Sequence, residues 1–112
     1  MTRVSLPVSH SDAVALASAE VERMGNGNFV LVESHEHEVD VGWVFSYQSA
    51  RYIETGSVSD ALAGNGPLLV DRRDGSVHHC WSGESWEDAV ERYRTTGRTL
   101  PPSLGRKPEQ DG

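Results

Sequence analysis

The stretch at residues 42–48 constrains the fold most, because large aromatic side chains occupy every second position of it. Alternate side chains of a β-strand point to opposite faces, so Trp43, Phe45 and Tyr47 share one face. Three aromatic rings on one face would cover most of a packed helix. The stretch is therefore predicted to be a strand with a core-facing aromatic side, rather than a platform on which bases or ligands stack. An exposed ring would instead mark a protein interface.

Two amphipathic helices are expected to enclose the strands. The first covers residues 9–24, where Ser9 can cap the helix and Asp12 completes an approximate capping box. The second covers residues 85–96, and Ser85 can cap it. Glycines follow both segments and are expected to end the helices. The buried stripe of the second helix is predicted to consist of Trp86, Ala89, Val90 and Tyr93.

Turn-forming residues divide the chain between these helices into further strands. These strands are expected over residues 29–33, 67–71 and 77–81. The pair Asp74-Gly75 predicts a tight hairpin turn between the last two, since it supplies the positive φ angles of such a turn. Residues 33–40 either extend the first strand or form its connection. Residues 50–54 are expected as a short strand or bridge, and residues 55–66 as a loop with one helical turn.

The order of these elements predicts an α+β fold. We expect an antiparallel β-sheet of about four strands, with the N-terminal and C-terminal helices packed on one face. The 112 residues suffice for one domain, placed at residues 8–97, and residues 98–112 are expected to be a disordered tail. The single cysteine, Cys80, excludes an internal disulfide. Because the sequence also lacks an export signal, a cytoplasmic location is expected.

Acidic side chains dominate the charge of the chain. Ten Lys and Arg against seventeen Asp and Glu give a formal net charge of −7 at pH 7. This balance argues against binding to nucleic acid or to an anionic membrane surface. Carboxylates concentrate in residues 33–40 and 84–91, which contain no Lys or Arg. We expect these segments to bind a basic protein partner, which electrostatic steering would help to capture, although a solvated surface is the alternative. The predicted partner-binding residues are Glu33, Glu36, Glu38, Asp40, Glu84, Glu87 and Asp88.

Residues that could support catalysis or bind metal are few. The sequence has no Gly-x-Ser-x-Gly elbow, phosphate loop or dinucleotide fingerprint. Cys80 is a candidate nucleophile beside His78 on one strand face, but a small, partly buried thiol is the simpler interpretation. His35 and His37, joined by His78, are candidate metal ligands, and the alternative is a solvated polar connection. No catalytic residue, metal site or cofactor is predicted.

Four segments of the chain form a combined pattern. They read Gly-Trp-Val-Phe-Ser-Tyr-Gln-Ser at 42–49, Tyr-Ile-Glu-Thr-Gly at 52–56, Leu-Ala-Gly-Asn-Gly-Pro at 62–67 and Val-Asp-Arg-Arg-Asp-Gly-Ser-Val at 70–77. Over about residues 10–95 the chain thereby resembles the immunity protein 35 family, also called the YrhB domain. The residues that match the family's motif are Gly42, Trp43, Phe45, Tyr47, Tyr52, Gly64, Asn65, Pro67, Asp71, Asp74 and Gly75.

The resemblance implies a small bacterial protein of a polymorphic toxin system. Such a protein binds a cognate toxin domain and blocks its active site or its access to substrate, without catalysis. A chaperone-like activity in one branch of the family makes a holdase-like small chaperone the alternative, which would need a large exposed apolar patch. We expect the motif residues to specify the fold and the acidic surface to contact the toxin. A monomer or a homodimer is expected, because an exposed sheet edge favours pairing.

Overall fold

The computed structural model describes residues 7–62 and 65–101, and it confirms the α+β fold. The elements are α1 (His10–Gly25), β1 (Phe29–Val39), β2 (Gly42–Ser49), α2 (Ala50–Thr55), the 3-10 helix η1 (Val58–Asp60), β3 (Leu68–Asp71), β4 (Val77–His79) and α3 (Trp86–Thr96). The strands form one antiparallel sheet in the order β1-β2-β3-β4. No helix among the described residues has the length and apolar character needed to cross a bilayer.

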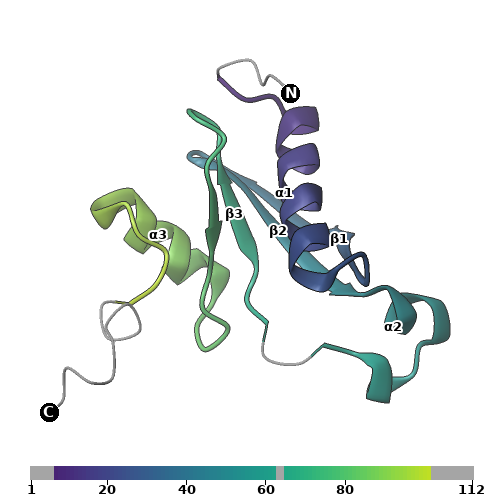
Figure 1. The fold of residues 1–112 in the computed structure, drawn as a ribbon. Coiled ribbons are helices and arrows are strands. Elements are labelled where there is room, and N and C mark those ends of the chain that lie inside the picture. Colours follow the sequence, from purple (N-terminus) through teal and green to yellow (C-terminus); the bar gives the residue numbers. More distant parts are fainter. Residues whose placement is uncertain (1–6, 63–64, 102–112) are drawn as a thin grey trace, which may run out of the picture.

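The helices α1 and α3 lie on opposite faces of the sheet (Figure 1), so the prediction that both pack on one face is wrong. Trp43, Phe45 and Tyr47 of β2 pack with α1, as the alternation predicted. Val44 and Leu69 pack with α3 on the other side. The reason lies in β3, whose residues are apolar at successive positions and are buried on both faces of the sheet. A strand of that kind needs cover on each side.

The ends of the two long helices are as predicted. The Ser9 hydroxyl accepts a hydrogen bond from the backbone N–H of Asp12, and the Asp12 carboxylate accepts one from the backbone N–H of Ser9. At the other end, Asn26 adopts the left-handed conformation and terminates α1. In α3, Ser85 accepts from the backbone N–H of Asp88 in the same way.

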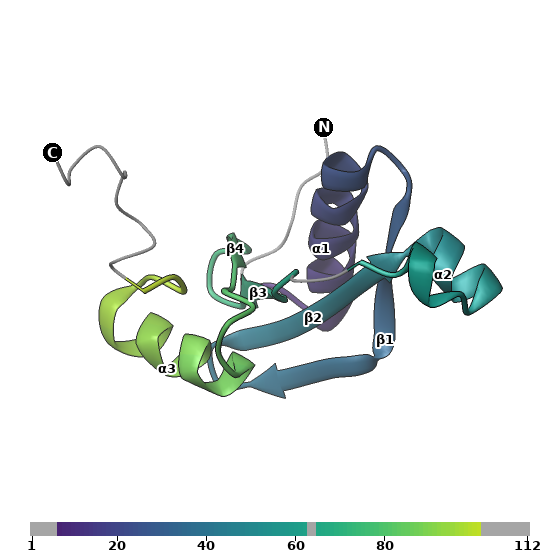
Figure 2. The ribbon, with the colours of Figure 1, turned by 90° about the horizontal axis from the view of Figure 1, so that it is seen from below.

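Residues 50–54 belong to a helix, α2, and not to the predicted short strand or bridge. The Ser49 hydroxyl caps it by accepting from the backbone N–H of Tyr52, and Gly56 ends it with a φ of 72°. The stretch is too short for periodicity to distinguish a strand from a helical turn. The single turn expected in the following loop is η1. Figure 2 shows that α2 projects from the end of β2, away from α1 and α3.

The polar segment that follows residue 32 extends β1, which is one of the two alternatives drawn from the sequence. The predicted hairpin between β3 and β4 is confirmed, but its turn is wider than expected. The backbone N–H of Asp71 donates to the carbonyl of Ser76, and of the Asp74-Gly75 pair only Gly75 has a positive φ, 77°. The Asp-Gly pair therefore predicted the position of the turn correctly, but not its type.

The described chain continues beyond the expected domain end at residue 97. Thr99 is buried, and its hydroxyl donates to the carbonyl oxygen of His79 in β4. The Arg92 guanidinium donates to the carbonyl of Thr99 over 2.8 Å. These bonds hold the chain after α3 against the sheet. The rest of the predicted tail, residues 102–112, lies outside the described residues.

Candidate partner-binding site

The first acidic segment forms an arch in β1. Val32 pairs with Ser46 and His37 pairs with Val44, so residues 33–36 of β1 lie opposite the single residue Phe45 of β2. We call residues 33–36 the β1 arch. The surplus of residues on one strand bends that strand and interrupts the ladder, as in the larger β-bulges where more than two residues oppose one. The edge strand β1 therefore has no paired residue opposite Phe45.

A cavity of about 350 Å³ lies where α1 meets the β1 arch, and we call it the α1–β1 cleft. The cleft has an apolar portion and a polar portion. The apolar lining residues are Val14, Leu31, Val32 and Phe45, and the polar ones are His10, Ser18, Glu33 and Glu36. The cleft thus combines apolar walls with two carboxylates of the first acidic segment.

The two carboxylates of the cleft differ in their partners. Nε2 of His10, in the first turn of α1, lies 2.6 Å from a carboxylate oxygen of Glu36. The imidazole of His10 also lies 5.9 Å from the ring of Trp43. Glu33 is exposed and forms no ion pair with any described residue. One carboxylate of the cleft therefore has a weakly basic partner from α1, and the other has none within the described chain.

Arginines from other elements neutralise the rest of the first acidic segment. Arg72 stacks over the ring of Trp43, with 4.6 Å from its guanidinium carbon to the ring centroid, and donates to Glu38 over 3.0 Å. Arg94 of α3 contacts both carboxylate oxygens of Asp40, and these hydrogen bonds lower the pKa of Asp40 below its usual value. The segment is acidic in sequence, but Glu38 and Asp40 are paired in space.

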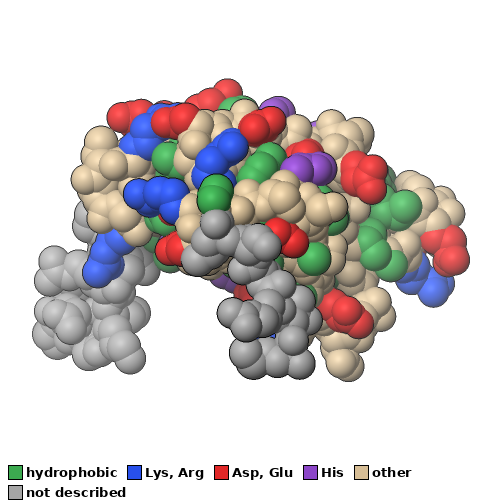
Figure 3. All heavy atoms as spheres, turned by 90° about the horizontal axis from the view of Figure 1, so that it is seen from above, with side chains coloured by type: hydrophobic (Ala, Val, Ile, Leu, Met, Phe, Trp, Pro, Cys, Tyr) green, Lys and Arg blue, Asp and Glu red, His purple; other side chains and the backbone are tan. Residues whose placement is uncertain are grey.

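The second acidic segment is also partly neutralised. Glu84 and Arg92 form two parallel hydrogen bonds of 2.6 Å, and only 11% of the Glu84 side chain is exposed. These bonds lower the pKa of Glu84. Glu87 and Asp88 are exposed in the first turn of α3 and form no ion pair with a described residue. Figure 3 shows this mixture on the face seen from above, where red acidic and blue basic side chains lie next to one another. Of the seven predicted partner-binding residues, Glu33, Glu87 and Asp88 are thus left without an internal cation.

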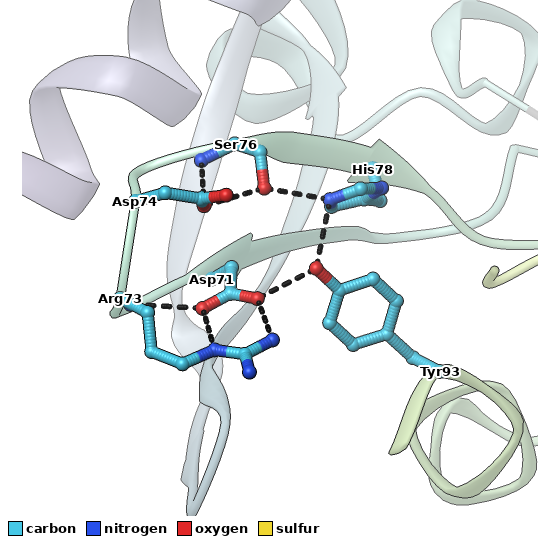
Figure 4. Close-up of polar contacts among 6 residues, drawn as sticks. All are labelled: Asp71, Arg73, Asp74, Ser76, His78 and Tyr93. Atoms are coloured by element: carbon cyan, nitrogen blue, oxygen red, sulfur yellow. Dashed lines mark hydrogen bonds and ion pairs between the residues drawn. The ribbon is translucent and has the colours of Figure 1, made fainter. Parts of the chain in front are cut away.

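A buried polar network at the β3–β4 hairpin was not predicted from the sequence (Figure 4). The fully buried Asp71 accepts hydrogen bonds from the backbone N–H of Arg73, from its guanidinium at 2.8 and 3.1 Å, and from the Tyr93 hydroxyl at 2.6 Å. The Arg73 guanidinium, more than any other group, holds the pKa of Asp71 well below its usual range. Asp71 thereby attaches the hairpin to α3. The motif named Asp71, but no local pattern connected it to Tyr93.

His78 completes this network. The Tyr93 hydroxyl donates to Asp71, and the Ser76 hydroxyl donates to Asp74 over 2.7 Å. Nε2 of His78 lies 2.8 Å from the Ser76 hydroxyl and 3.1 Å from the Tyr93 hydroxyl. Because both hydroxyl protons are already engaged, both oxygens are left to accept, and Nε2 is assigned as the protonated nitrogen. Burial lowers the pKa of His78 below its usual value.

The candidate nucleophile Cys80 lies in the core, and the candidate metal ligands His35 and His37 contact other side chains. Cys80 is buried, and burial raises the pKa of its thiol to about 12, which opposes the thiolate that nucleophilic chemistry needs. His37 stacks on Trp86 with 4.4 Å between ring centroids, and His35 is exposed beside Ser34. Within the described ranges, no group of three or more His, Cys, Asp or Glu side chains could hold a metal ion.

Several motif residues make contacts within the fold. A Cβ atom at Gly42 would lie 1.8 Å from the carbonyl oxygen of Val70, so only glycine permits this approach of β2 to β3. The Asn65 amide donates to the carbonyl of Tyr47 over 3.0 Å, and the carbonyl of Pro67 accepts from the backbone N–H of Cys80. The motif residue Gly64 lies outside the described residues, and Tyr52 is half-buried in α2.

Two comparisons with known proteins find a match. A family model, Immunity protein 35, matches residues 11–96. The chain is also 24% identical over 93 residues to the uncharacterized protein YrhB of Escherichia coli (strain K12), with 83% of this chain and 96% of that protein covered. No solved structure matches the chain. Because the family match covers α1 through α3, we conclude that the chain belongs to the immunity protein 35 family.

Proposed function

We propose that this protein is a non-enzymatic immunity protein, which binds a cognate protein toxin of a polymorphic toxin system and neutralises it. The observation that carries the proposal is the family match over residues 11–96. The chemistry of the described residues is compatible with a binding role, because the only cysteine is a buried thiol of raised pKa and the buried carboxylate, Asp71, is fully hydrogen-bonded. The protein acts in the cytoplasm, where the toxin would otherwise damage the cell that makes it.

The toxin-binding surface is proposed to be acidic. Among the seven predicted partner-binding residues, those without an arginine partner in the described chain are Glu33, Glu36, Glu87 and Asp88. Glu33 and Glu36 line the α1–β1 cleft, and Glu87 and Asp88 lie in the first turn of α3. Glu38, Asp40 and Glu84 are paired with arginines of the chain itself, so we do not propose them as direct contacts. A basic partner surface would be steered toward such a domain, with association rates that fall as salt rises.

The alternative, a holdase-like chaperone, requires a contiguous apolar surface. The large apolar side chains that are exposed in the described chain are Val30, Ile53, Val58, Trp81 and Leu100. They come from β1, from the neighbouring elements α2 and η1, and from the segments after β4 and after α3, which approach each other where Thr99 is bonded to His79. This distribution supports the immunity protein over the chaperone.

Co-expression with the toxin tests the proposal. Cells that make the toxin encoded by the neighbouring gene should survive when this protein is present and die when it is absent, and the purified pair should form a complex. Toxicity that is unchanged by the protein contradicts the proposal. A matched chaperone test uses unrelated aggregating proteins, such as heated citrate synthase, whose aggregation the protein should not suppress at a modest molar ratio.

The acidic surface is tested with charge reversals that leave internal ion pairs intact. Glu33→Lys and Glu87→Lys should weaken toxin binding and reduce its salt dependence, because neither residue has an arginine partner to lose. Reversal of Asp40 is the less suitable variant, since it would place a lysine against Arg94 and disturb the fold. Equal affinity and equal salt dependence in the Glu33 and Glu87 variants would contradict an acidic interface.

A further inference from the structure

We propose that the α1–β1 cleft receives an arginine side chain of the toxin, whose guanidinium group binds between Glu33 and Glu36. The inference rests on the proposed function, because the arginine is supplied by the partner. It specifies what the function leaves open, namely the place on this chain where the partner is anchored and the chemistry of the anchor.

The shape of the cleft suits one long side chain. Its volume of about 350 Å³ is at the lower end of the roughly 300–1,000 Å³ typical of small-molecule sites. Val14, Leu31 and Phe45 supply apolar contacts along its walls. An arginine can lay its aliphatic stem on such walls while its charged head stays at the polar rim. Arginine is also among the residues that most often carry the binding energy of a protein interface.

The charge of the cleft is complementary to a guanidinium. Three other carboxylates of the acidic segments receive arginines from the chain itself: Arg72 contacts Glu38, Arg94 contacts Asp40 and Arg92 contacts Glu84. The lining of the cleft contains no Lys or Arg. The cleft is therefore a place where two carboxylates adjoin an apolar cavity and the described chain provides no guanidinium of its own.

The contact between His10 and Glu36 shows that the Glu36 carboxylate is accessible to a nitrogen donor. Nε2 of His10 approaches Glu36 to 2.6 Å, although the His10 side chain is 54% exposed. A guanidinium carries five N–H donors in a planar fork, so it can contact Glu36 from one edge and Glu33 from another. The ammonium of lysine is a compact, strongly hydrated point charge whose three donors radiate from one nitrogen, so it lacks the planar fork of a guanidinium. We therefore expect arginine to be preferred to lysine.

A titration with a single-residue probe tests the cleft directly. N-acetyl-L-arginine N-methylamide is added to the 15N-labelled full chain at low ionic strength, with the lysine and citrulline analogues as matched probes. The arginine probe should bind saturably with a dissociation constant on the order of 1 mM. The amides that shift should belong to α1, the β1 arch and residue 45. Lysine should bind several-fold more weakly, and the uncharged citrulline should not bind. Shifts without saturation, shifts outside the cleft, or equal binding of citrulline overturn the proposal.

Paired variants separate the cleft from general negative charge. The double variant Glu33→Gln/Glu36→Gln should weaken binding of the arginine probe at least tenfold. The control Glu87→Gln/Asp88→Asn removes the same charge from α3, away from the cleft, and should change the affinity less than twofold. Equal losses in the two double variants would mean that the probe senses only net charge, and the proposal would be wrong.

A steric variant tests the cavity without altering charge. Ser18 lines the cleft from an exposed position of α1, so Ser18→Phe should fill the cavity and abolish binding of the arginine probe. Ala15→Phe places the same side chain on an exposed position of the same helix that does not line the cleft, and it should leave binding unchanged. Unchanged binding in Ser18→Phe would overturn the proposal.

Co-expression with the toxin distinguishes this proposal from the proposed function. Protection by the wild type that is lost in Glu33→Gln/Glu36→Gln and kept in Glu22→Gln/Glu54→Gln supports both, because the second variant removes the same charge from exposed positions outside the cleft and outside the acidic segments. Full protection by the cleft variant, when that variant no longer binds the arginine probe, overturns the arginine anchor and leaves the immunity function standing. Absence of protection by the wild type overturns the immunity function itself, whatever the probe does.

Discussion

The face of the sheet that carries α3 is anchored by a buried, hydrogen-bonded carboxylate as well as by apolar contacts, whereas the face that carries α1 borders the α1–β1 cleft. A cavity of about 310 Å³ also adjoins α3, but Arg94 lines it beside Glu87 and Glu91. On the α3 face, Val44 and Leu69 pack against the helix, and the buried Asp71 is bonded to Tyr93. On the α1 face, the β1 arch leaves a cavity of about 350 Å³ beside Phe45. The same two central strands supply both faces, so the difference comes from what covers them.

We expect the two faces to have different roles, one in the stability of the domain and the other in the binding of its partner. On the α3 face, Asp71 and Glu84 are satisfied by hydrogen bonds and ion pairs within the chain, so substitutions of these two residues should destabilise the domain. The α1 face keeps polar groups and unfilled volume at its surface, so substitutions there should alter what the domain binds. Where the fold leaves polar groups and volume unfilled, a partner can make new contacts without breaking many contacts within the domain.

Truncation of Leu69 should produce the largest loss of stability. Leu69 is fully buried between β3 and α3, so Leu69→Ala should lower the free energy of unfolding by about 3 to 4 kcal/mol. Leu31 is half-buried beside the cleft, and Leu31→Ala should cost about 1 kcal/mol because the site is already partly open. Urea unfolding followed by circular dichroism measures both. Equal losses would mean that the α1 face is packed as tightly as the α3 face.

Loss of the buried carboxylate should have the next largest effect. Asp71→Asn removes the charge to which Arg73 and Tyr93 donate, and it should cost about 2 kcal/mol. On the other face, Glu36→Gln removes an exposed contact to His10, and it should cost no more than about 0.5 kcal/mol. The same unfolding experiment compares the two. A larger loss for Glu36 than for Asp71 would reverse the roles assigned to the two faces.

The helices were predictable because their signals are local. Ser9 with Asp12 and Ser85 with Asp88 were each recognised as caps from residues three positions apart, and each cap is present. The alternation at residues 42–48 likewise identified the strand β2 and its aromatic face, because side-chain direction in a strand follows from position alone. A local pattern of this kind predicts both the type of the element and the direction in which its side chains point.

The placement of α3 and the neutralised carboxylates could not be predicted in this way. Asp40 and Arg94 are separated by 54 residues, and nothing near either residue indicates the other. The segments 33–40 and 84–91, which contain acidic side chains but no Lys or Arg, are therefore interpreted from the sequence as open acidic surfaces. In the structure, arginines of other elements form ion pairs with several of their carboxylates. The β1 arch was equally hidden, because a polar run of residues is compatible with an extended strand, a bulge or a loop.

Acidification should destabilise the α3 face through His78. Burial lowers the pKa of His78 from its ordinary 6.5, although Asp71 and Asp74 act to raise it and His79 acts to lower it further. The unfolded chain therefore takes up this proton at a higher pH than the folded chain does. The contribution of neutral His78 is fully present above pH 6.5 and is lost as the pH falls from there toward the lower pKa of the folded state.

The measurement is the midpoint of urea unfolding at several pH values between about 7.5 and 5. Asp71 and Asp74 have lowered pKa values and stay ionised throughout this window. The wild type should lose stability as the pH falls, and His78→Gln should lose less, because the glutamine cannot take up a proton. A slope that is unchanged by His78→Gln would show that other groups cause the acid sensitivity.

The smallest effects are expected for two single carboxylates. Glu84 forms an ion pair within the fold, and Glu33 forms none with a described residue. Glu84→Gln breaks two short hydrogen bonds to Arg92, which also holds the carbonyl of Thr99, and it should cost about 1 kcal/mol. Glu33→Gln should change the free energy of unfolding by less than about 0.5 kcal/mol, because Glu33 is exposed and has no ion pair within the described chain. Toxin affinity should show the opposite order, with the larger loss in the Glu33 variant. If Glu84→Gln weakened toxin binding more than Glu33→Gln did, while remaining folded, the contact surface would lie at α3 and the open face would have no special role.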